Sequence, residues 1–319
     1  MSLHPYFRAL RDEHERSGAP ALYEMSVEDA RRADRLDTAR AAGTPEPVAR
    51  VDDVPVATPA GDVPLRVYRP RADDVLPALV YFHGGGWVVG GLETADAVCR
   101  SLANRAGCVV VAVGYRKAPE SKFPAAVDDC RAATEHVARD AARLGVDAER
   151  IAVGGDSAGG NLAAAVTLLA RDEGGPRLAA QLLVYPVTDY MADTQSMRDG
   201  GDPHLFNRKS MEWYWGHYLA DAANATDPLA SPLRAADLAG LPPALVVTAE
   251  FDPLRDEGEA YARRLEDAGV DVELVRYEGL AHGFFTMVGV LAEARAAHDR
   301  AASWLRRRFE ARREPGGPA

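Results

Sequence analysis

Short, nearly continuous apolar runs alternate with longer amphipathic segments from about residue 50 onward. Apolar runs of this length predict strands that are buried on both faces, and spacing of three to four residues predicts helices. Strands are expected at residues 63–68, 78–82, 109–113, 151–153, 181–185, 244–248 and 272–277, and helices at about 124–143, 159–172, 256–268 and 289–309. This alternation predicts an α/β fold with a mostly parallel central sheet flanked by helices. The first two strands, joined without a helix, are expected to form an antiparallel edge.

Two segments depart from this pattern and predict a helical cap. Residues 1–48 are charged and Ala-rich, with Ser26 as a helix start and Gly43 as a stop, so we separate them from a main domain at 49–319. Residues 190–225 carry four aromatic side chains in one helical stretch and are assigned to the cap, as a lid over a pocket or as plain core. The Pro- and Gly-rich tail, residues 314–319, is expected to be disordered.

Composition narrows the class of protein. The 319 residues are 47% hydrophobic and 27% charged, which is typical of a soluble globular protein. A net charge of −11 argues against binding to nucleic acid or to an anionic membrane. Cys99, Cys108 and Cys130 show neither disulfide-framework nor metal-ligand spacing, so no metal is expected. The N-terminus lacks a signal-peptide pattern, and we expect a cytoplasmic protein.

The sharpest local signal is Gly-Asp-Ser-Ala-Gly-Gly at residues 155–160, between a predicted strand and a predicted helix. A G-x-S-x-G pattern in a strand-turn-helix context predicts a serine nucleophile on a tight turn. Gly155 and Gly159 leave room where strand and helix approach each other. Ser157 is therefore the candidate nucleophile, at a helix N-terminus that favours negative charge.

A second signal follows the strand at 78–82, where His-Gly-Gly-Gly-Trp occupies residues 83–87. Consecutive glycines let backbone N–H groups face a cavity, as an oxyanion hole requires. We assign the donors to Gly84 and Gly85, together with Ala158 beside the nucleophile. His83 is expected to anchor this loop through hydrogen bonds rather than to act as a base.

A serine nucleophile needs a base and an orienting acid, and both follow predicted strands near the C-terminus. His282 lies in a glycine-flanked loop after the last strand and is the candidate base. Asp252 lies at the end of the strand before it and is the preferred acid, with Asp256 and Glu250 as alternatives. The chain order Ser, Asp, His is that of α/β-hydrolases. We also assign Trp87, Asp156 and Trp213 to substrate binding.

With these residues identified, the chain strongly resembles the bacterial hormone-sensitive-lipase-like esterases, often called family IV, from about residue 60 to 310. The matching motifs are His83-Gly84-Gly85-Gly86-Trp87, Tyr115-Arg116-Lys117-Ala118-Pro119-Glu120 with Phe123-Pro124-Ala125, Gly155-Asp156-Ser157-Ala158-Gly159-Gly160-Asn161, Asp252-Pro253-Leu254-Arg255-Asp256-Glu257-Gly258 and His282-Gly283-Phe284. The resemblance implies a helical cap, hydrolysis of short- to medium-chain acyl esters, no cofactor, frequent homodimers, and Asp252 as the triad acid.

Small departures from the family pattern lie beside the glycine loop and bear on substrate preference. Lys117 stands where the family usually has Leu, Ser121-Lys122 replaces His-Pro, and Gly114 replaces a polar residue. The resulting hypothesis is a serine carboxylesterase acting on a small-molecule ester. An amidase or deacetylase of a specific metabolite is the alternative enzyme, because the same triad cleaves both bonds. A non-catalytic receptor of this fold is the alternative from another class. An exposed edge at residues 272–277 is a candidate dimer contact, unless a helix covers it.

Overall fold

Eight strands form one central sheet in the computed structural model, which describes residues 2–72 and 74–312. The strands are β1 (Arg50–Thr58), β2 (Gly61–Arg69), β3 (Leu76–Phe82), β4 (Val109–Val113), β5 (Val146–Asp156), β6 (Leu178–Val184), β7 (Ala244–Phe251) and β8 (Val272–Ala281). Their order across the sheet is β1-β2-β4-β3-β5-β6-β7-β8. Strands β3 to β8 are parallel to one another, whereas β1 and β2 are antiparallel to their neighbours. The predicted α/β class is confirmed.

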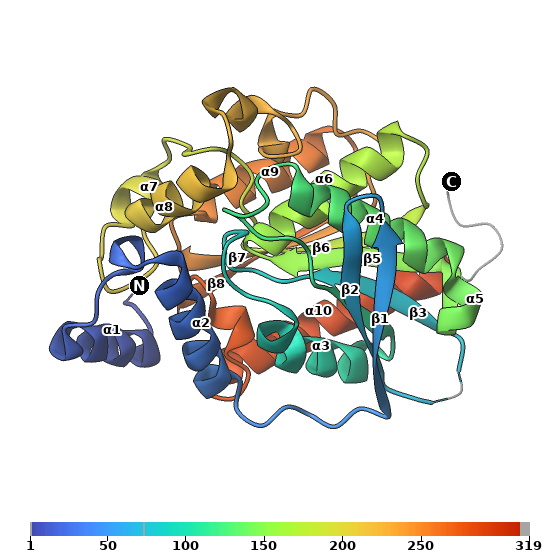
Figure 1. The fold of residues 1–319 in the computed structure, drawn as a ribbon, viewed down its shortest axis with the longest axis horizontal. Coiled ribbons are helices and arrows are strands. Elements are labelled where there is room, and N and C mark those ends of the chain that lie inside the picture. The colour runs from blue at the N-terminus through green and yellow to red at the C-terminus, as the bar shows by residue number, and fades with distance from the viewer. Residues whose placement is uncertain (1, 73, 313–319) are drawn as a thin grey trace.

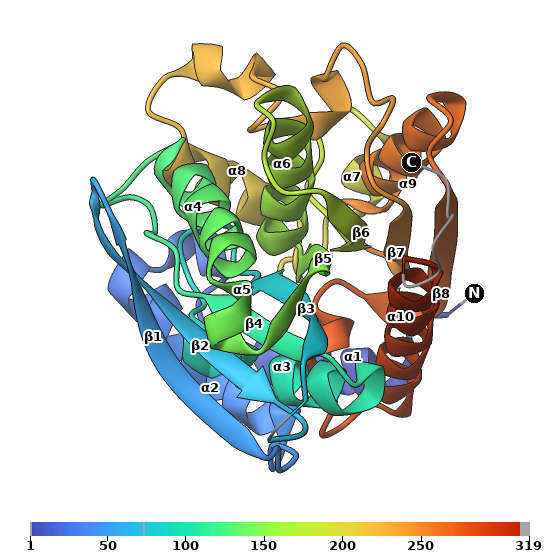
Figure 2. The same cartoon turned by 90° about the vertical axis from the view of Figure 1, so that its right-hand side faces the viewer.

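Helices cover both faces of the sheet (Figures 1 and 2). One face packs against α3 (Leu92–Ala106) and α10 (Ala292–Ala311), and the other against α4 (Ala125–Arg139), α5 (Ala141–Leu144), α6 (Ala158–Asp172) and α9 (Arg255–Asp267). Each face has its own hydrophobic core. In β3, Leu79 and Tyr81 belong to the core under α3 and α10, whereas Val80 and Phe82 belong to the core under α4, α6 and α9. Alternate side chains thus enter opposite cores, which explains why the buried strands read as continuous apolar runs.

The antiparallel edge differs from the prediction. We expected residues 63–68 and 78–82 to pair directly, but β4 lies between β2 and β3. The antiparallel partners of β2 are β4 and the unpredicted strand β1. The β1 strand alternates charged and apolar residues and carries Pro55, which is tolerated at a sheet edge because no ladder hydrogen bond is needed there.

Helix α3, which connects β3 to β4, was also not predicted. Its buried residues include Ala95, Val98, Leu102 and Ala106, spaced by three or four positions on one face. This crossover helix is what allows β3 and β4 to lie parallel. Its buried face also lines the pocket described below.

The N-terminal segment contains α1 (Pro5–Ser17), a short 3-10 turn η1 (Leu22–Glu24) and α2 (Val27–Ala42). Ser26 caps α2 by accepting a hydrogen bond from the Asp29 N–H at 3.1 Å, and Gly43 follows the last residue of the helix. The start and stop predicted for this helix are confirmed. Arg31 on α2 donates to the carbonyls of Val88 and Ala118, which ties the helix to the loops that follow β3 and β4.

Residues 190–225 form α7 (Gln195–Asp199), α8 (Arg208–Tyr218) and a 3-10 turn η2 (Ala222–Thr226). This segment contacts the N-terminal segment: the Lys209 ammonium lies 5.2 Å from the centroid of the Tyr23 ring, and His14 Nδ1 lies 3.2 Å from the His204 carbonyl oxygen. Figure 1 shows α1, α2, α7 and α8 on the same side of the molecule.

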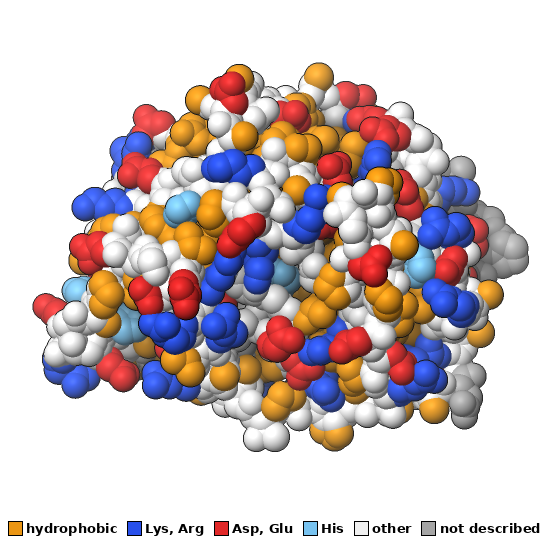
Figure 3. All heavy atoms as spheres, in the orientation of Figure 1, with side chains coloured by type: hydrophobic (Ala, Val, Ile, Leu, Met, Phe, Trp, Pro, Cys, Tyr) orange, Lys and Arg blue, Asp and Glu red, His pale blue; other side chains and the backbone are white. Residues whose placement is uncertain are grey.

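Acidic, basic and apolar side chains are interspersed over the face seen in Figure 3. In the described part of the chain, no helix combines the length and the apolar character that crossing a bilayer requires. The tail at 314–319, for which we expected disorder, lies outside the described residues.

Candidate active site

Ser157 occupies a strained turn between β5 and α6. Its φ of 56° lies in the left-handed region that non-glycine residues rarely adopt, at a cost of roughly 1–3 kcal/mol. A Cβ at Gly155 or Gly159 would lie 2.3 or 1.9 Å from the Phe82 carbonyl oxygen, so only glycine permits the close approach of strand and helix. The hydroxyl is thereby presented above the sheet at the N-terminus of α6.

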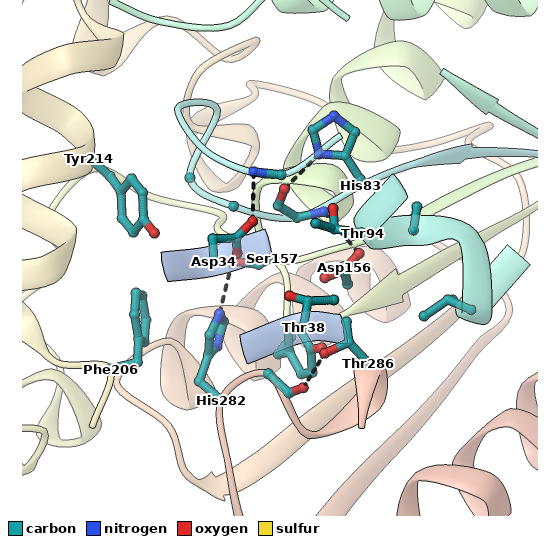
Figure 4. A pocket seen from close by; sticks show the side chains of 18 of the residues that line it. Asp34, Thr38, His83, Thr94, Asp156, Ser157, Phe206, Tyr214, His282 and Thr286 are labelled. Carbon is teal, nitrogen blue, oxygen red and sulfur yellow. Dashed lines mark hydrogen bonds between the residues drawn. The ribbon is translucent and has the colours of Figure 1, made fainter. Parts of the chain in front are cut away.

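Ser157, His282 and Asp252 form a continuous hydrogen-bond chain, of which Figure 4 shows the contact between Ser157 and His282. His282 Nε2 lies 2.9 Å from Ser157 Oγ, and His282 Nδ1 lies 2.7 Å from Asp252 Oδ2. A carboxylate can only accept, so Nδ1 carries the proton and Nε2 is free to accept the serine proton. Asp252 is 2% exposed, and its other oxygen accepts the Leu254 N–H at 2.8 Å. The arrangement is that of a Ser-His-Asp triad.

The alternative acids have other partners. Asp256 accepts the Ser196 N–H at 2.8 Å and pairs with Arg255. Glu250 accepts the Gly279 N–H at 2.7 Å. Of the three carboxylates weighed from the sequence, the structure brings only Asp252 to His282.

The imidazole of His282 contacts two aromatic rings that were not predicted to belong to the site. Phe206, from the segment before α8, stacks on it at 4.1 Å with an interplanar angle of 20°. Tyr185, directly after β6, packs against the same imidazole with the ring centroids 4.6 Å apart and an interplanar angle of 51°. The two rings restrict the imidazole to the orientation that links Ser157 and Asp252.

The glycine loop corrects one assignment. The Gly84 N–H donates to Asp156 Oδ1 at 3.0 Å, and the Tyr81 hydroxyl donates to the same oxygen at 2.7 Å. Gly84 is therefore already engaged within the protein and does not offer its N–H to a substrate. The next two glycines, Gly85 and Gly86, have φ values of 105° and 55°, which permit the sharp turn of the loop.

His83 has the anchoring position expected of it. Its Nδ1 lies 2.7 Å from the Gly84 carbonyl oxygen, and its ring stacks on Tyr115 at 4.2 Å. The Tyr115 hydroxyl donates to the His83 carbonyl at 2.8 Å. Burial lowers the pKa of His83 to about 3, which keeps the imidazole neutral and compatible with its apolar surroundings.

A cavity of about 170 Å³ opens beside Ser157 and His282 (Figure 4). Its walls come from the glycine loop, from α2, from α3 and from the segment 190–225. The lining residues are Asp34, Thr38, Tyr81, His83, Gly84, Gly85, Gly86, Gly90, Thr94, Ala95, Val98, Asp156, Ser157, Tyr185, Phe206, Tyr214, His282, Gly283 and Thr286. The cavity is smaller than the ~300–1,000 Å³ of most ligand pockets.

Of the three residues assigned to substrate binding, only Asp156 lines this cavity. Trp87 is 0% exposed and stacks on Tyr218 at 4.0 Å, so it supports the loop from behind and cannot touch a substrate in this structure. Trp213 packs against Tyr214 and His217 and is not itself among the lining residues. Its neighbour Tyr214 enters the cavity instead, because successive residues of a helix point in different directions.

Comparison with known proteins adds three findings. A family model described as an α/β hydrolase fold matches residues 79–286. The carboxylic ester hydrolase LipN of Mycobacterium tuberculosis is 46% identical over 76% of this chain and 67% of its own length. An ethyl acetate hydrolase of Pseudomonas putida is 40% identical over 92% of this chain and 95% of its own length.

Solved structures agree over nearly the whole chain. An ester hydrolase from the metagenome of Lake Arreo superposes with a TM-score of 0.93 at 42% identity, covering 97% of this chain and 99% of the other. An esterase of the archaeon Pyrobaculum calidifontis superposes with a TM-score of 0.91 at 43% identity, covering 96% and 99%.

Proposed function

Because the chain belongs to the hormone-sensitive-lipase-like family of α/β hydrolases and is a serine carboxylesterase, we propose that Ser157, His282 and Asp252 carry its catalysis. The observation behind this assignment is the unbroken chain of hydrogen bonds from Ser157 through His282 to Asp252, at 2.9 and 2.7 Å. The family membership also makes a small-molecule ester the substrate class.

In the proposed reaction, Ser157 Oγ attacks the ester carbonyl while His282 Nε2 accepts the hydroxyl proton. The carbonyl oxygen becomes an oxyanion, and His282 then donates its proton to the departing alcohol. Water repeats the sequence on the acyl-enzyme: His282 takes a proton from the water, and returns it to Ser157 when the acid leaves. Asp252 holds the imidazole in the required tautomer and stabilises its cationic form.

For the oxyanion hole we propose the N–H groups of Gly85, Gly86 and Ala158. Within the described residues, these three groups donate to no protein acceptor, whereas the Gly84 N–H is engaged by Asp156. Ala158 begins α6, where the helix dipole also favours negative charge. Each such donor contributes about 3–4 kcal/mol to stabilising the transition state.

Substitution of Gly85 by alanine tests the oxyanion proposal. A Cβ there would lie 2.6 Å from the Val89 carbonyl oxygen at a φ of 105°, so the loop must shift. We expect kcat to fall by about 10²- to 10³-fold with little change in KM, since ground-state contacts are spared. The matched control is Gly91→Ala in the same loop, where the backbone is extended and the nearest atom lies 3.4 Å away. Equal kcat values for the two variants would contradict the proposal.

The cavity volume leads us to propose a preference for short acyl chains. A space of about 170 Å³ beside the nucleophile is small for a long acyl group. With p-nitrophenyl esters from acetate to laurate, we expect kcat/KM to be highest at the short end and to fall at least about tenfold by laurate. A profile that stays level to laurate would contradict this. The p-nitroanilide of the best acyl group, run in parallel, measures the competing amidase activity.

We further propose that residues 1–48 and 190–225 together form the cap over this cavity. Both segments contribute lining residues, Asp34 and Thr38 from α2 and Phe206 and Tyr214 from the later segment. The contacts between Tyr23 and Lys209 and between His14 and His204 support treating them as one unit.

A cytoplasmic location and a homodimer complete the proposal. The edge strand β8 supports the homodimer. It is the last strand of the sheet, so one of its edges pairs with β7 and the other faces outward, and its Leu274 is exposed. Among the described residues, the N-terminal segment hydrogen-bonds to β8 near the C-terminal end of the strand, where the His4 N–H donates to the Gly279 carbonyl at 2.8 Å. The part from 272 to 277 is the expected contact.

A further inference from the structure

A carboxylate from the cap faces the reacting atoms. Asp34 and Thr38 lie one turn apart on α2, and Figure 4 shows both side chains projecting into the cavity that holds Ser157 and His282. The triad mechanism uses neither residue. Ionised Asp34 places a negative charge on the wall of a small cavity, which favours some substrates over others.

The surroundings leave Asp34 only partly satisfied. Its Oδ2 accepts the Gly90 N–H at 3.1 Å, and among the described residues its second oxygen accepts no hydrogen bond. The charge of Lys117 acts on Asp34, but its ammonium donates to the Gly90 carbonyl, and no ion pair joins the two among the described residues. Burial raises the pKa of Asp34 to about 6, so the carboxylate is largely ionised at pH 7.5. The raised pKa means that the surroundings disfavour the charged form, which a bound cation would stabilise.

The cavity as a whole is negative and partly aromatic. Its charged side chains are Asp34 and Asp156, and no Lys or Arg is among the described residues that line it. Phe206 and Tyr214 lie on the cap side with ring centroids 6.5 Å apart. Burial, and next the charge of Asp34, raise the pKa of Tyr214, which means that its hydroxyl lies within the field of the carboxylate. A carboxylate beside aromatic rings is an arrangement that stabilises organic cations.

We propose that Asp34 is a specificity-determining residue that makes this esterase prefer esters carrying an ammonium group over neutral esters of the same shape. The inference rests on the proposed esterase activity and adds the chemical class of the substrate. The ammonium group would neutralise the partly buried carboxylate and contact the rings of Phe206 and Tyr214. The net charge of −11 adds a long-range attraction for the same cations.

The rival interpretation is that Asp34 only anchors α2 to the glycine loop through Gly90. Asp34→Asn separates the two roles, because an asparagine oxygen can still accept the Gly90 N–H while the charge is removed. The matched control is Asp37→Asn, which removes the same charge from the exposed side of the same helix.

The test compares acetylcholine with 3,3-dimethylbutyl acetate, which replaces the charged nitrogen by carbon. In Asp34→Asn we expect the ratio of kcat/KM for acetylcholine to kcat/KM for the neutral ester to fall by about tenfold or more, because the loss falls mainly on the charged ester. Asp37→Asn should keep the wild-type ratio. A second pair of substrates carries the ammonium group in the acyl part: p-nitrophenyl 4-(trimethylammonio)butyrate and its neutral counterpart p-nitrophenyl 5,5-dimethylhexanoate. Comparing the two pairs shows whether Asp34 attracts a cation in the acyl part or in the alcohol part of the ester. An unchanged ratio in both pairs, or equal losses on charged and neutral esters, would overturn the proposal.

Inhibition by choline supplies a second readout that separates failure of this proposal from failure of the esterase assignment. Choline should inhibit hydrolysis of neutral p-nitrophenyl acetate competitively, with a Ki about tenfold higher in Asp34→Asn. As pH falls from 7.5 to 5, protonation of Asp34 should raise the wild-type Ki, because a neutral carboxyl no longer attracts a cation. Other charged or titratable groups near Asp34 are Lys117, Asp156, Asp37, Tyr214 and His282, and the Asn variant retains them all. An equally steep pH dependence in that variant would contradict the proposal, whereas absence of hydrolysis of every neutral ester would instead reject the esterase function.

Discussion

Alanine in place of Ser157 is expected to lower kcat on p-nitrophenyl butyrate by about 10⁶-fold, as removal of a triad nucleophile does in other serine hydrolases. The substitution deletes only the hydroxyl oxygen, which lies 2.9 Å from His282 Nε2. Without it no acyl-enzyme forms, and the remaining hydrolysis depends on water and on the oxyanion donors. Initial rates with wild type and variant at the same substrate concentrations measure the effect.

The fold should survive this substitution. Alanine retains the Cβ and the same strained backbone but removes a buried hydroxyl, so the thermal unfolding temperature is expected to stay at or above that of wild type. Ser17→Ala, at the exposed end of α1, serves as the matched control and should keep full activity. Comparable rates for Ser157→Ala and wild type would mean that another residue is the nucleophile.

The turn that carries Ser157 was predictable because the residues that form it are close together in the sequence. A strand, a tight turn with glycines two positions on either side of Ser157, and a helix occupy fewer than about 30 consecutive residues, and each leaves a sequence pattern. Asp252 and His282 were predictable for a similar reason, because each follows a strand that the sequence predicts: β7 is largely apolar, and β8 carries apolar residues between charged ones. Strand ends of a parallel sheet lie at one edge, so the triad follows from strand positions alone.

The antiparallel edge of the sheet was less accessible. The crossover through α3 decides that β2 pairs with β4 rather than with β3. The helical pattern of α3 was hard to recognise because Thr94, Ser101 and Asn104 lie among its apolar residues. Strand β1 is partly exposed and alternates charge with apolar residues, so it lacks the continuous run by which the buried strands were found. It is recognised as a strand in the structure because it pairs with β2.

The details of the pocket depend on contacts between distant segments. Whether the Gly84 N–H is free depends on Asp156, 72 positions later in the chain. Likewise, the role of Trp87 depends on the stacking of Tyr218, and that of Asp34 on how α2 lies over the glycine loop. The helical spacing of Asp34 and Thr38 was visible in the sequence, but nothing local showed which face of α2 turns toward Ser157.

Asp252→Asn is expected to lower kcat by about 10⁴-fold while leaving the fold intact. An asparagine can turn its NH₂ group toward His282 Nδ1, which fixes the proton on Nε2. In that tautomer Nε2 cannot accept the proton of Ser157, and the imidazolium that forms during the reaction loses its counter-ion. The buried position of Asp252, 2% exposed, means that solvent does not replace the lost charge. Steady-state kinetics on the same p-nitrophenyl ester measure the loss.

Asp256→Asn provides the comparison, since this carboxylate lies four residues away and was the alternative acid from the sequence. Its contacts to Ser196 and Arg255 concern the junction of α7 and α9 and do not reach His282. We therefore expect kcat of this variant to remain within about tenfold of wild type, because a partly exposed ion pair contributes at most about 1 kcal/mol. A larger loss in Asp256→Asn than in Asp252→Asn would transfer the role of triad acid to Asp256. A larger loss in Asp252→Asn, together with the loss in Ser157→Ala, would support the proposed roles: His282 takes the proton of Ser157, and Asp252 stabilises the imidazolium that results.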